Sequence, residues 1–315
     1  CIGLGMTARE QLLSFLAKAD DPNSGGRQMP QHYGHKDLRI VSQSSPTGTQ
    51  FLQAVGCAMA RKKENSKEIV YVSSGEGTTS QGDFHEALNW ASNAKAPVIF
   101  HIQDNEYAIS THKSEQTAGS VYNMTAGYKN LSRYDVDGTD FFETNLAFRQ
   151  AVDRARKGKG PSVIISNVVR LLPHSSSDDQ RKYRTEEDLD EDKKRDPIKV
   201  LEDQCLKEKF ISSNEFKKIR DTVTTQIDED AQWAEEQSYP EPSTALDHIY
   251  SNDSINDEID YESISDKIVI VDAISHALKE EMDRNDKILV YGQDIADPKG
   301  GVFTCLLYTS PSPRD

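Results

Sequence analysis

The chain has 315 residues, 28% of them charged, and its formal net charge at pH 7 is −15. This length corresponds to about two domains, each long enough to bury a core. The strong negative charge repels nucleic-acid phosphates and anionic lipids, so it argues against a nucleic-acid-binding or membrane-surface protein. No apolar run approaches the roughly 20 residues that a membrane helix needs, and we expect a soluble chain.

The cysteines of this chain are few and scattered. Cys1, Cys57, Cys205 and Cys305 form no CxxC pair and show no metal-ligand spacing. This pattern predicts no disulfide framework and favours a reducing compartment, the cytoplasm. The chain begins at Cys1 without a methionine or a signal-peptide pattern, so we interpret it as a fragment whose true start is missing.

The apolar pattern predicts alternating helices and strands over the first 170 residues. A capping box formed by Thr7 and Glu10 opens a helix that we expect to end near Ala19. After a Gly- and Pro-rich loop over 20–34, the expected elements are a helix over 50–61, a strand over 68–72, a helix over 83–94, a strand over 98–102, a helix over 144–157 and a strand over 162–169. Strand, glycine-containing turn, helix and strand in succession form a βαβ unit. The predicted fold class is therefore α/β, with a parallel sheet flanked by helices.

The composition changes after the last of these strands. Residues 175–196 are densely charged, and two polar amphipathic helices are expected within 197–237. An acidic stretch rich in Ser, Asn and Asp then predicts a linker, after which a new αβ pattern begins with a helix capped by Asp272 and a strand over 287–291. The predicted organisation is a first domain over 1–250, a linker over 251–265, and the start of a second, similar α/β domain over 266–303.

The most informative residue is Glu76, which stands between Gly75 and Gly77 at the end of a predicted strand. Glycines there let the backbone approach a phosphate closely, and the helix that follows offers free N–H groups to a pyrophosphate. Asn105 lies one βαβ crossover later, so it should arrive beside Glu76 at the carboxyl edge of the sheet. Oxygen ligands beside a diphosphate suit Mg²⁺. The spacing predicts a Mg²⁺–diphosphate site.

The surrounding residues resemble a known family. SQGDFHEALN over 80–89 and YAIS over 107–110 are similar to the α subunit of the thiamine-diphosphate-dependent 2-oxo acid dehydrogenase decarboxylating component. Glu76 and the tripeptide Ser114-Glu115-Gln116 look most like the branched-chain (2-oxoisovalerate) members of this family. Three other segments are also similar: 26–34, near the cofactor in that family; 44–50, which wraps the cofactor; and 170–184, the active-site loop. The resemblance implies the thiamine-diphosphate-binding fold, oxidative decarboxylation of a 2-oxo acid, and acyl transfer to a lipoyl group.

The resemblance also implies roles for individual residues. Mg²⁺ would be held by Glu76, Asn105 and the carbonyl of Tyr107, and thiamine diphosphate would be lined by Ser45, Thr47, Gly75, Gly77 and Thr78. Candidates for a potassium site are Ser44, Pro46, Thr49 and Gln50, and the candidate catalytic residue is His174. The alternative interpretation of His174 is a loop histidine without a functional role. Ser175 stands at a position that is phosphorylated in some family members, but we interpret it as a loop serine without a regulatory role.

The chain departs from the family pattern close to the expected site. Asp104 stands where the family usually has Asn. Gln103 stands where branched-chain members have an Arg near the diphosphate, which removes a bidentate phosphate contact. Pyruvate or acetoin therefore stays open as an alternative substrate, and a non-catalytic cofactor-binding or structural subunit stays open as an alternative class.

Residues 267–303 resemble the opening of the β subunit of the same enzyme. We therefore expect an α–β fusion that stops early in β, with a non-native tail over 304–315 where the resemblance ends abruptly. Because the family's cofactor-activating glutamate lies further along β, we expect this fragment alone to be inactive. The implied partners are the lipoyl-bearing acyltransferase of a 2-oxo acid dehydrogenase complex and a second copy of the fusion, as a dimer.

Overall fold

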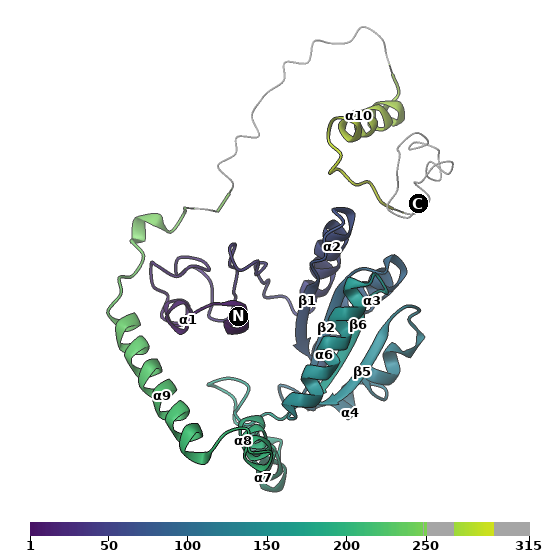
Figure 1. Ribbon diagram of the computed structural model, residues 1–315. Helices are drawn as coiled ribbons and strands as arrows, with labels where there is room; N and C mark the ends of the chain where they lie inside the picture. Colours follow the sequence, from purple (N-terminus) through teal and green to yellow (C-terminus); the bar gives the residue numbers. More distant parts are fainter. Residues whose placement is uncertain (248, 251–267, 293–315) are drawn as a thin grey trace. The chain divides into compact units, whose positions relative to one another are not determined.

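The computed structural model describes residues 1–247, 249–250 and 268–292 (Figure 1). The chain divides into two compact units, Cys1–Leu246 and Asp247–Asp315. In chain order, the helices and strands of the first unit are α1 (Ala8–Phe15), α2 (Thr49–Lys63), β1 (Val70–Gly75), α3 (Gly82–Ala94), β2 (Val98–Asp104), β3 (Tyr107–Ala108), β4 (Thr111–His112), α4 (Lys113–Gln116), α5 (Val121–Met124), β5 (Ser132–Asp137), α6 (Phe141–Arg156), β6 (Ser162–Asn167), α7 (Glu186–Lys194), α8 (Pro197–Lys207) and α9 (Ser213–Glu235).

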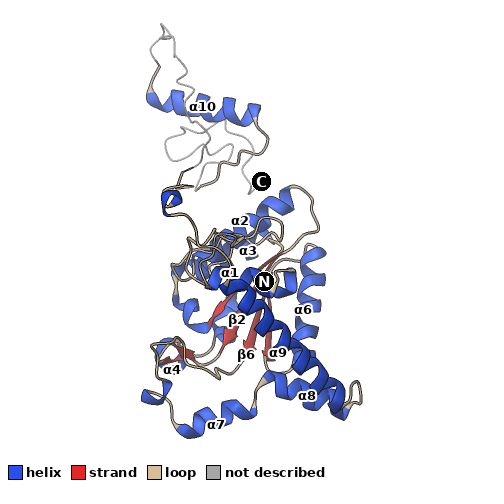
Figure 2. Cartoon of the chain, turned by 90° about the vertical axis from the view of Figure 1, so that its left-hand side faces the viewer, coloured by secondary structure: helices blue, strands red, loops and turns tan. Residues whose placement is uncertain are grey.

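A parallel sheet forms the centre of this unit (Figure 2). Its four strands follow the order β1-β2-β6-β5 (Figure 1). The predicted βαβ unit is confirmed, because β1 continues through α3 into β2 and the two strands pair in parallel. Gly75 at the end of β1 lies in register with Gln103 of β2. The carboxyl ends of neighbouring strands therefore meet at one edge, as the predicted α/β fold class requires.

The core lies on both faces of the sheet. Helices α2 and α3 cover one face, where Phe51 of α2 packs against Phe100 of β2 with ring centroids 6.1 Å apart. Helix α6 covers the other face, where Ala151 packs with Ile99 of β2. Successive residues of a strand point to opposite faces, so the apolar run of β2 is buried on both sides.

Several boundaries differ from those expected from the sequence. Helix α1 ends at Phe15 rather than near Ala19, because Ala17 has a φ of 51°, in the left-handed region that an α-helix cannot contain. Strand β1 begins two residues later than expected and extends to Gly75. Strand β5 is not predicted from the sequence. Its sequence, SRYDVD, is mostly polar, and among the described strands it pairs with β6 alone, at the edge of the sheet.

Two polar helices follow the sheet within 197–237, as predicted, and α9 returns to pack against α1. Arg9 of α1 forms an ion pair of 2.6 Å with Asp230 of α9. Lys18 is buried, and its Nζ donates to the carbonyls of Glu235 and Gln237 at 2.8 Å each. A cation at the carboxyl end of a helix is favourable, so Lys18 stabilises this contact.

In the second unit, the structure describes a helix, α10 (Ile270–Arg284), and the residues up to 292. The N-cap of α10 is Val269, so Asp272 lies inside the first turn and the predicted cap was wrong. The strand expected over 287–291 is also wrong, because these residues adopt no strand conformation. A strand needs a neighbour to satisfy its backbone groups, and the described residues of this unit pair with none. The predicted linker over 251–265, residues 293–303 and the predicted tail over 304–315 lie outside the described residues.

No helix in the described ranges combines the length and apolar character needed to cross a membrane. The cysteines at positions 1, 57 and 205 are free, and Cys305 lies outside the described residues.

Candidate functional site

The candidate site begins where β1 ends. Gly75 closes the strand, and a 3-10 turn over Glu76–Ser80 carries the chain to α3. The Glu76 side chain is buried, with 3% of the residue exposed, and its Oε2 accepts the backbone N–H of Asn105 at 3.2 Å. Its Oε1 is buried without a hydrogen-bond partner. Burial raises the pKa of this carboxyl above its usual value, and backbone N–H groups of Glu76 and Asn105 oppose that rise.

Asn105 follows directly after β2. Its Oδ1 accepts the backbone N–H of Tyr107 at 3.1 Å, so the turn between β2 and β3 is closed by the Asn side chain itself. The structure thus brings Glu76 and Asn105 together across one βαβ crossover, and Tyr107 lies two residues further along the same turn.

The residues at this edge fit a divalent cation. Burying a carboxylate oxygen without a protein partner costs free energy unless a positive group binds that oxygen. Glu76 Oε1 is such an oxygen. Among the described residues, no group of three or more His, Cys, Asp or Glu side chains could hold a metal on its own. A site with one carboxylate, an amide and a carbonyl suits Mg²⁺, which keeps phosphate oxygens and waters in its coordination sphere.

Gly77 lets the glycine turn lie against the β3–β4 hairpin. A Cβ added at Gly77 would stand 2.6 Å from the Cβ of Ala108, closer than any real contact. The Nε2 of Gln116 donates to the carbonyl of Gly77 at 2.6 Å and to Ser80 Oγ at 2.7 Å. Thr78 is buried and accepts a hydrogen bond from Ser74 Oγ at 2.7 Å. The turn is therefore fixed from both sides.

The segment over 44–50 meets the same turn. Gly48 has a φ of 98°, and a Cβ there would lie 3.0 Å from the Cβ of Gln81 and 3.7 Å from Thr78. Ser45 is exposed and its Oγ lies 2.7 Å from Nε2 of His32, while Thr47 is also exposed. The structure thus places the candidate cofactor segment next to Thr78.

The candidate potassium residues lie at the start of α2. Ser44 Oγ and Thr49 Oγ1 are 2.5 Å apart, and Thr49 Oγ1 donates to the carbonyl of Pro46 at 3.0 Å. Gln50 instead turns its Oε1 to the backbone N–H of Gly48 at 3.1 Å. The structure therefore gathers the oxygens of Ser44, Pro46 and Thr49, while the Gln50 oxygen is engaged by the adjacent loop.

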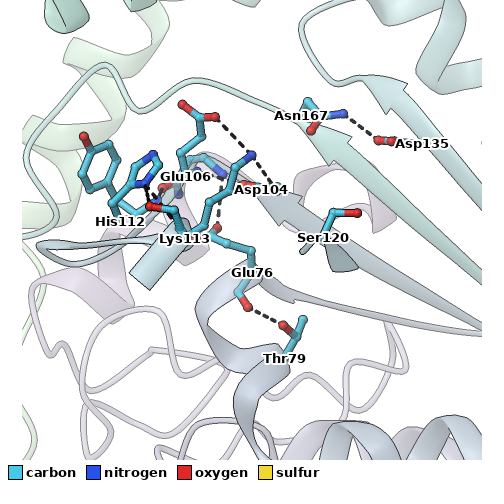
Figure 3. A network of polar contacts seen from close by, with 12 residues as sticks. Glu76, Thr79, Asp104, Glu106, His112, Lys113, Ser120, Asp135 and Asn167 are labelled. Carbon is cyan, nitrogen blue, oxygen red and sulfur yellow. Dashed lines mark hydrogen bonds and ion pairs between the residues drawn. The ribbon is translucent and has the colours of Figure 1, made fainter. Parts of the chain in front are cut away.

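A charged cluster supports the turn after β2 (Figure 3). Asp104 is buried, and Lys113 Nζ lies 3.3 Å from its Oδ2 and 3.1 Å from Oε1 of Glu106. Partial burial lowers the pKa of Lys113, but its contacts with Glu106 and Asp104 outweigh this effect and raise the pKa above the usual value. The ammonium group is therefore charged at neutral pH and balances two carboxylates.

The loop over 170–184 contacts the β3–β4 hairpin. Arg170 donates to the carbonyl of Ile109 and to the hydroxyl of Tyr183, at 2.7 Å each. Tyr183 donates in turn to Oδ2 of Asp178 at 2.7 Å, and the same oxygen accepts the backbone N–H of His174 at 2.9 Å. His174 is exposed. Its loop is thus tied to the hairpin that starts at Tyr107, and the imidazole faces solvent.

Sequence reasoning missed the roles of Lys113 and Glu106. The available signal was the alternation Asp104-Asn105-Glu106, which places a carboxylate on either side of the Asn105 amide, followed by a lysine seven residues after Glu106. Two acidic residues around a turn need a cation nearby when one of them is buried. The sequence alone does not show that the hairpin folds back to supply it.

The family model described as dehydrogenase E1 component matches residues 1–243, which include the glycine turn, Asn105 and the loop over 170–184. The chain belongs to this family. Membership implies thiamine diphosphate as the cofactor, which agrees with the Mg²⁺–diphosphate site expected from the spacing of Glu76 and Asn105. The match ends before residue 266, so the fusion to a β subunit stays a prediction.

Individual E1 relatives are also similar to the chain. It is 42% identical over 252 residues to the 2-oxoisovalerate dehydrogenase subunit alpha of Bacillus subtilis, covering 79% of this chain and 76% of the relative. It is 36% identical over 227 residues to the mitochondrial 2-oxoisovalerate dehydrogenase subunit alpha of Homo sapiens, covering 71% and 51%. It is 38% identical over 186 residues to the pyruvate dehydrogenase E1 component subunit alpha of Staphylococcus aureus, covering 58% and 49%. The chain thus spans about half the length of the human and staphylococcal relatives.

Proposed function

We propose that this chain is the α part of a branched-chain 2-oxo acid dehydrogenase E1 component, which decarboxylates a 2-oxo acid of the 2-oxoisovalerate type oxidatively and transfers the acyl group to a lipoyl group. The observation that carries the proposal is the buried, unpartnered Oε1 of Glu76 beside Asn105 at the carboxyl edge of the sheet. The identity of 42% to the Bacillus subtilis 2-oxoisovalerate dehydrogenase subunit alpha supports the branched-chain substrate.

In this proposal, Glu76, Asn105 and the Tyr107 carbonyl hold Mg²⁺ against the diphosphate. Thiamine diphosphate, when bound, supplies the electron sink for decarboxylation, and the protein supplies position and electrostatics. Gly77 is proposed to keep the turn against the β3–β4 hairpin, where a Cβ would stand 2.6 Å from the Cβ of Ala108, so that the backbone of the turn can face the diphosphate. The other residues proposed to line the cofactor are Ser45, Thr47, Gly75 and Thr78, and K⁺ is proposed at Ser44, Pro46 and Thr49 with Gln50.

His174 is proposed to act on the acyl-accepting side of the reaction. It lies on an exposed loop that Arg170 fastens to the hairpin through the carbonyl of Ile109, so its imidazole can meet a group arriving from solvent. A lipoyl group on a partner protein is such a group. The partners of the proposal are therefore the lipoyl-bearing acyltransferase and a second copy of the enzyme. The cytoplasmic location stays a prediction from the scattered cysteines.

Calorimetric titration of the full-length protein tests the cofactor site. Thiamine diphosphate should bind in the presence of Mg²⁺ and lose most of its affinity when EDTA removes the metal. Thiamine without its diphosphate is the matched control and should not bind under either condition, because it lacks the phosphate oxygens through which the cofactor would reach a metal held by Glu76 and Asn105. Binding of thiamine diphosphate that is indifferent to metal, or no binding at all, contradicts the proposal.

The substrate is tested separately, in the complete enzyme with a lipoyl acceptor. We expect kcat/KM for 2-oxoisovalerate to exceed that for pyruvate by at least about tenfold. A hydrophobic pocket shaped for a branched side chain discriminates by roughly this factor against pyruvate, whose methyl group leaves the pocket partly unfilled. The similarity to the staphylococcal pyruvate enzyme makes pyruvate the competing candidate. A preference for pyruvate would retain the cofactor site and overturn the branched-chain assignment.

A further inference from the structure

The turn that carries the proposed metal ligands contains a backbone conformation unusual for its sequence. Glu106 has a φ of 71°, in the left-handed region that favours glycine, and it stands directly between Asn105 and Tyr107. A residue with a side chain occupies this region at an energetic cost, which the surrounding contacts must offset.

Lys113 supplies contacts that hold this conformation. Its backbone N–H donates to the carbonyl of Glu106 at 2.8 Å, and its Nζ lies 3.1 Å from Oε1 of the same residue. The Nζ also reaches Oδ2 of Asp104 at 3.3 Å, while Oδ1 of Asp104 accepts the backbone N–H of Glu106 at 2.9 Å. One lysine thus joins the residues on either side of Asn105 (Figure 3).

We infer that Lys113 is a positioning residue for the proposed metal site. It fixes the turn from Asp104 to Tyr107 through Glu106, and it thereby aims Asn105 and the Tyr107 carbonyl at the metal beside Glu76. This inference rests on the proposed function. The carboxylates of Asp104 and Glu106 occupy two sides of the Lys113 ammonium group. Lys113 therefore acts on the turn, and it does not replace the diphosphate-binding arginine that is absent at position 103.

A purely electrostatic role makes the opposite prediction. Lys113 carries a positive charge close to the site of a divalent cation, and removing it would strengthen Mg²⁺ binding if charge alone mattered. Positioning predicts weaker binding, because the turn relaxes and its oxygen ligands move out of place. The sign of the change therefore separates the two explanations.

The measurement is the apparent Kd for Mg²⁺, determined by calorimetry on the full-length protein at saturating thiamine diphosphate. We expect Lys113→Met to raise this Kd about tenfold, in line with the loss of residues that orient metal ligands. Lys157→Met is the matched control, because Lys157 forms an exposed ion pair with Asp153 far from the turn in sequence, and it should leave the Kd unchanged. An unchanged or lower Kd for Lys113→Met overturns the inference.

A second pair of variants keeps the test independent of folding at Lys113. Glu106→Gln and Glu106→Gly both remove the same charge from a side chain that is 55% exposed, but only glycine adopts a φ of 71° without strain. We expect Glu106→Gln to raise the Kd for Mg²⁺ about threefold, because it keeps the strained backbone and loses an exposed ion pair with Lys113 that is worth only a few-fold. Glu106→Gly should leave the Kd within about twofold, because glycine needs no such contact to hold the turn. Equal effects of the two substitutions would overturn positioning through this turn.

The double variant Lys113→Met/Glu106→Gly tests whether Lys113 acts through the backbone conformation of Glu106. Glycine removes the strain that Lys113 offsets, so the Kd for Mg²⁺ should return most of the way to the wild-type value, and no recovery contradicts the inference. Cofactor binding by the wild-type protein distinguishes failure of this inference from failure of the proposed function. If it binds thiamine diphosphate with Mg²⁺ and the variants match it, only the role of Lys113 is wrong. If it binds no cofactor with metal, the proposed function is wrong.

Discussion

The backbone N–H of Asn105 donates to the Glu76 carboxylate at 3.2 Å, although 29 residues separate the two along the chain. The bond joins the carboxyl ends of β1 and β2. It engages one carboxylate oxygen and leaves the other buried without a partner. Because the bond comes from the backbone, it fixes the orientation of Glu76 without using the Asn105 side chain.

The first prediction concerns these two residues. Glu76→Gln removes the charge that attracts the metal, and Asn105→Ala removes the amide oxygen. Each should weaken Mg²⁺-dependent binding of thiamine diphosphate by about a hundredfold or more, since a lost ligand costs at least as much as a lost supporting contact. Calorimetric titration measures this. Glu86→Gln, an exposed glutamate on α3, is the control and should bind normally. Normal affinity in Glu76→Gln would remove it from the site.

The second prediction concerns the glycine turn. Gly77→Ala places a methyl group 2.6 Å from the Cβ of Ala108, so the hairpin that carries Tyr107 must shift. We expect the affinity for thiamine diphosphate to fall by about tenfold or more, because overpacking displaces the surrounding backbone. Gly82→Ala is a matched control, since nothing lies within 4 Å of a Cβ at that position. Equal affinities of the two variants would show that the close approach of turn and hairpin is not needed.

The third prediction concerns His174. In the complete enzyme, His174→Ala should lower reductive acylation of the lipoyl group by about a hundredfold, a usual value for loss of a positioned polar group, and change the Kd of thiamine diphosphate less than about twofold. The reason is that His174 is exposed on its loop, while the proposed metal residues come from the ends of β1 and β2. Single-turnover acylation and calorimetry measure the two quantities. Acyl transfer at the wild-type rate would identify His174 as an ordinary loop histidine.

The fourth prediction concerns His101, which lies buried on β2. Its Nδ1 is 2.8 Å from the hydroxyl of Tyr71 and its Nε2 is 2.9 Å from Ser166 Oγ. Burial lowers the pKa of His101 from 6.5 to about 4. The unfolded chain therefore binds a proton between these values while the folded chain does not. Stability is full above pH 6.5 and falls as the pH drops toward 4.

The expected size follows from this difference in pKa. Between pH 7 and pH 5, His101 should lower the free energy of unfolding by about 2 kcal/mol. Urea unfolding at the two pH values, for the wild type and His101→Phe, isolates this contribution, because phenylalanine retains an aromatic ring against Phe148 and does not titrate. If the wild type and the variant lose the same stability over this interval, His101 does not titrate as proposed.

Local patterns and chain connectivity determined much of this protein. The capping box of Thr7 and Glu10 forms as expected, because both partners lie within one helical turn. The apolar run over 98–102 becomes a central strand, because only burial on both faces accommodates it. The proximity of Glu76 and Asn105 also follows from sequence, since a βαβ crossover brings the carboxyl ends of its two strands to one edge of the sheet.

Only the tertiary structure decided the features that depend on distant partners. Strand β5 has a polar sequence and exists because the edge of β6 offers it hydrogen bonds, whereas residues 287–291 have a strand-like sequence and no described neighbour to pair with. The left-handed conformation of Glu106 is held by Lys113, which reaches it only because the hairpin folds back. Periodicity and spacing report which groups a segment must bury or bring to one edge. They do not report which side chain arrives to satisfy a buried charge, because that depends on contacts made after the elements have packed.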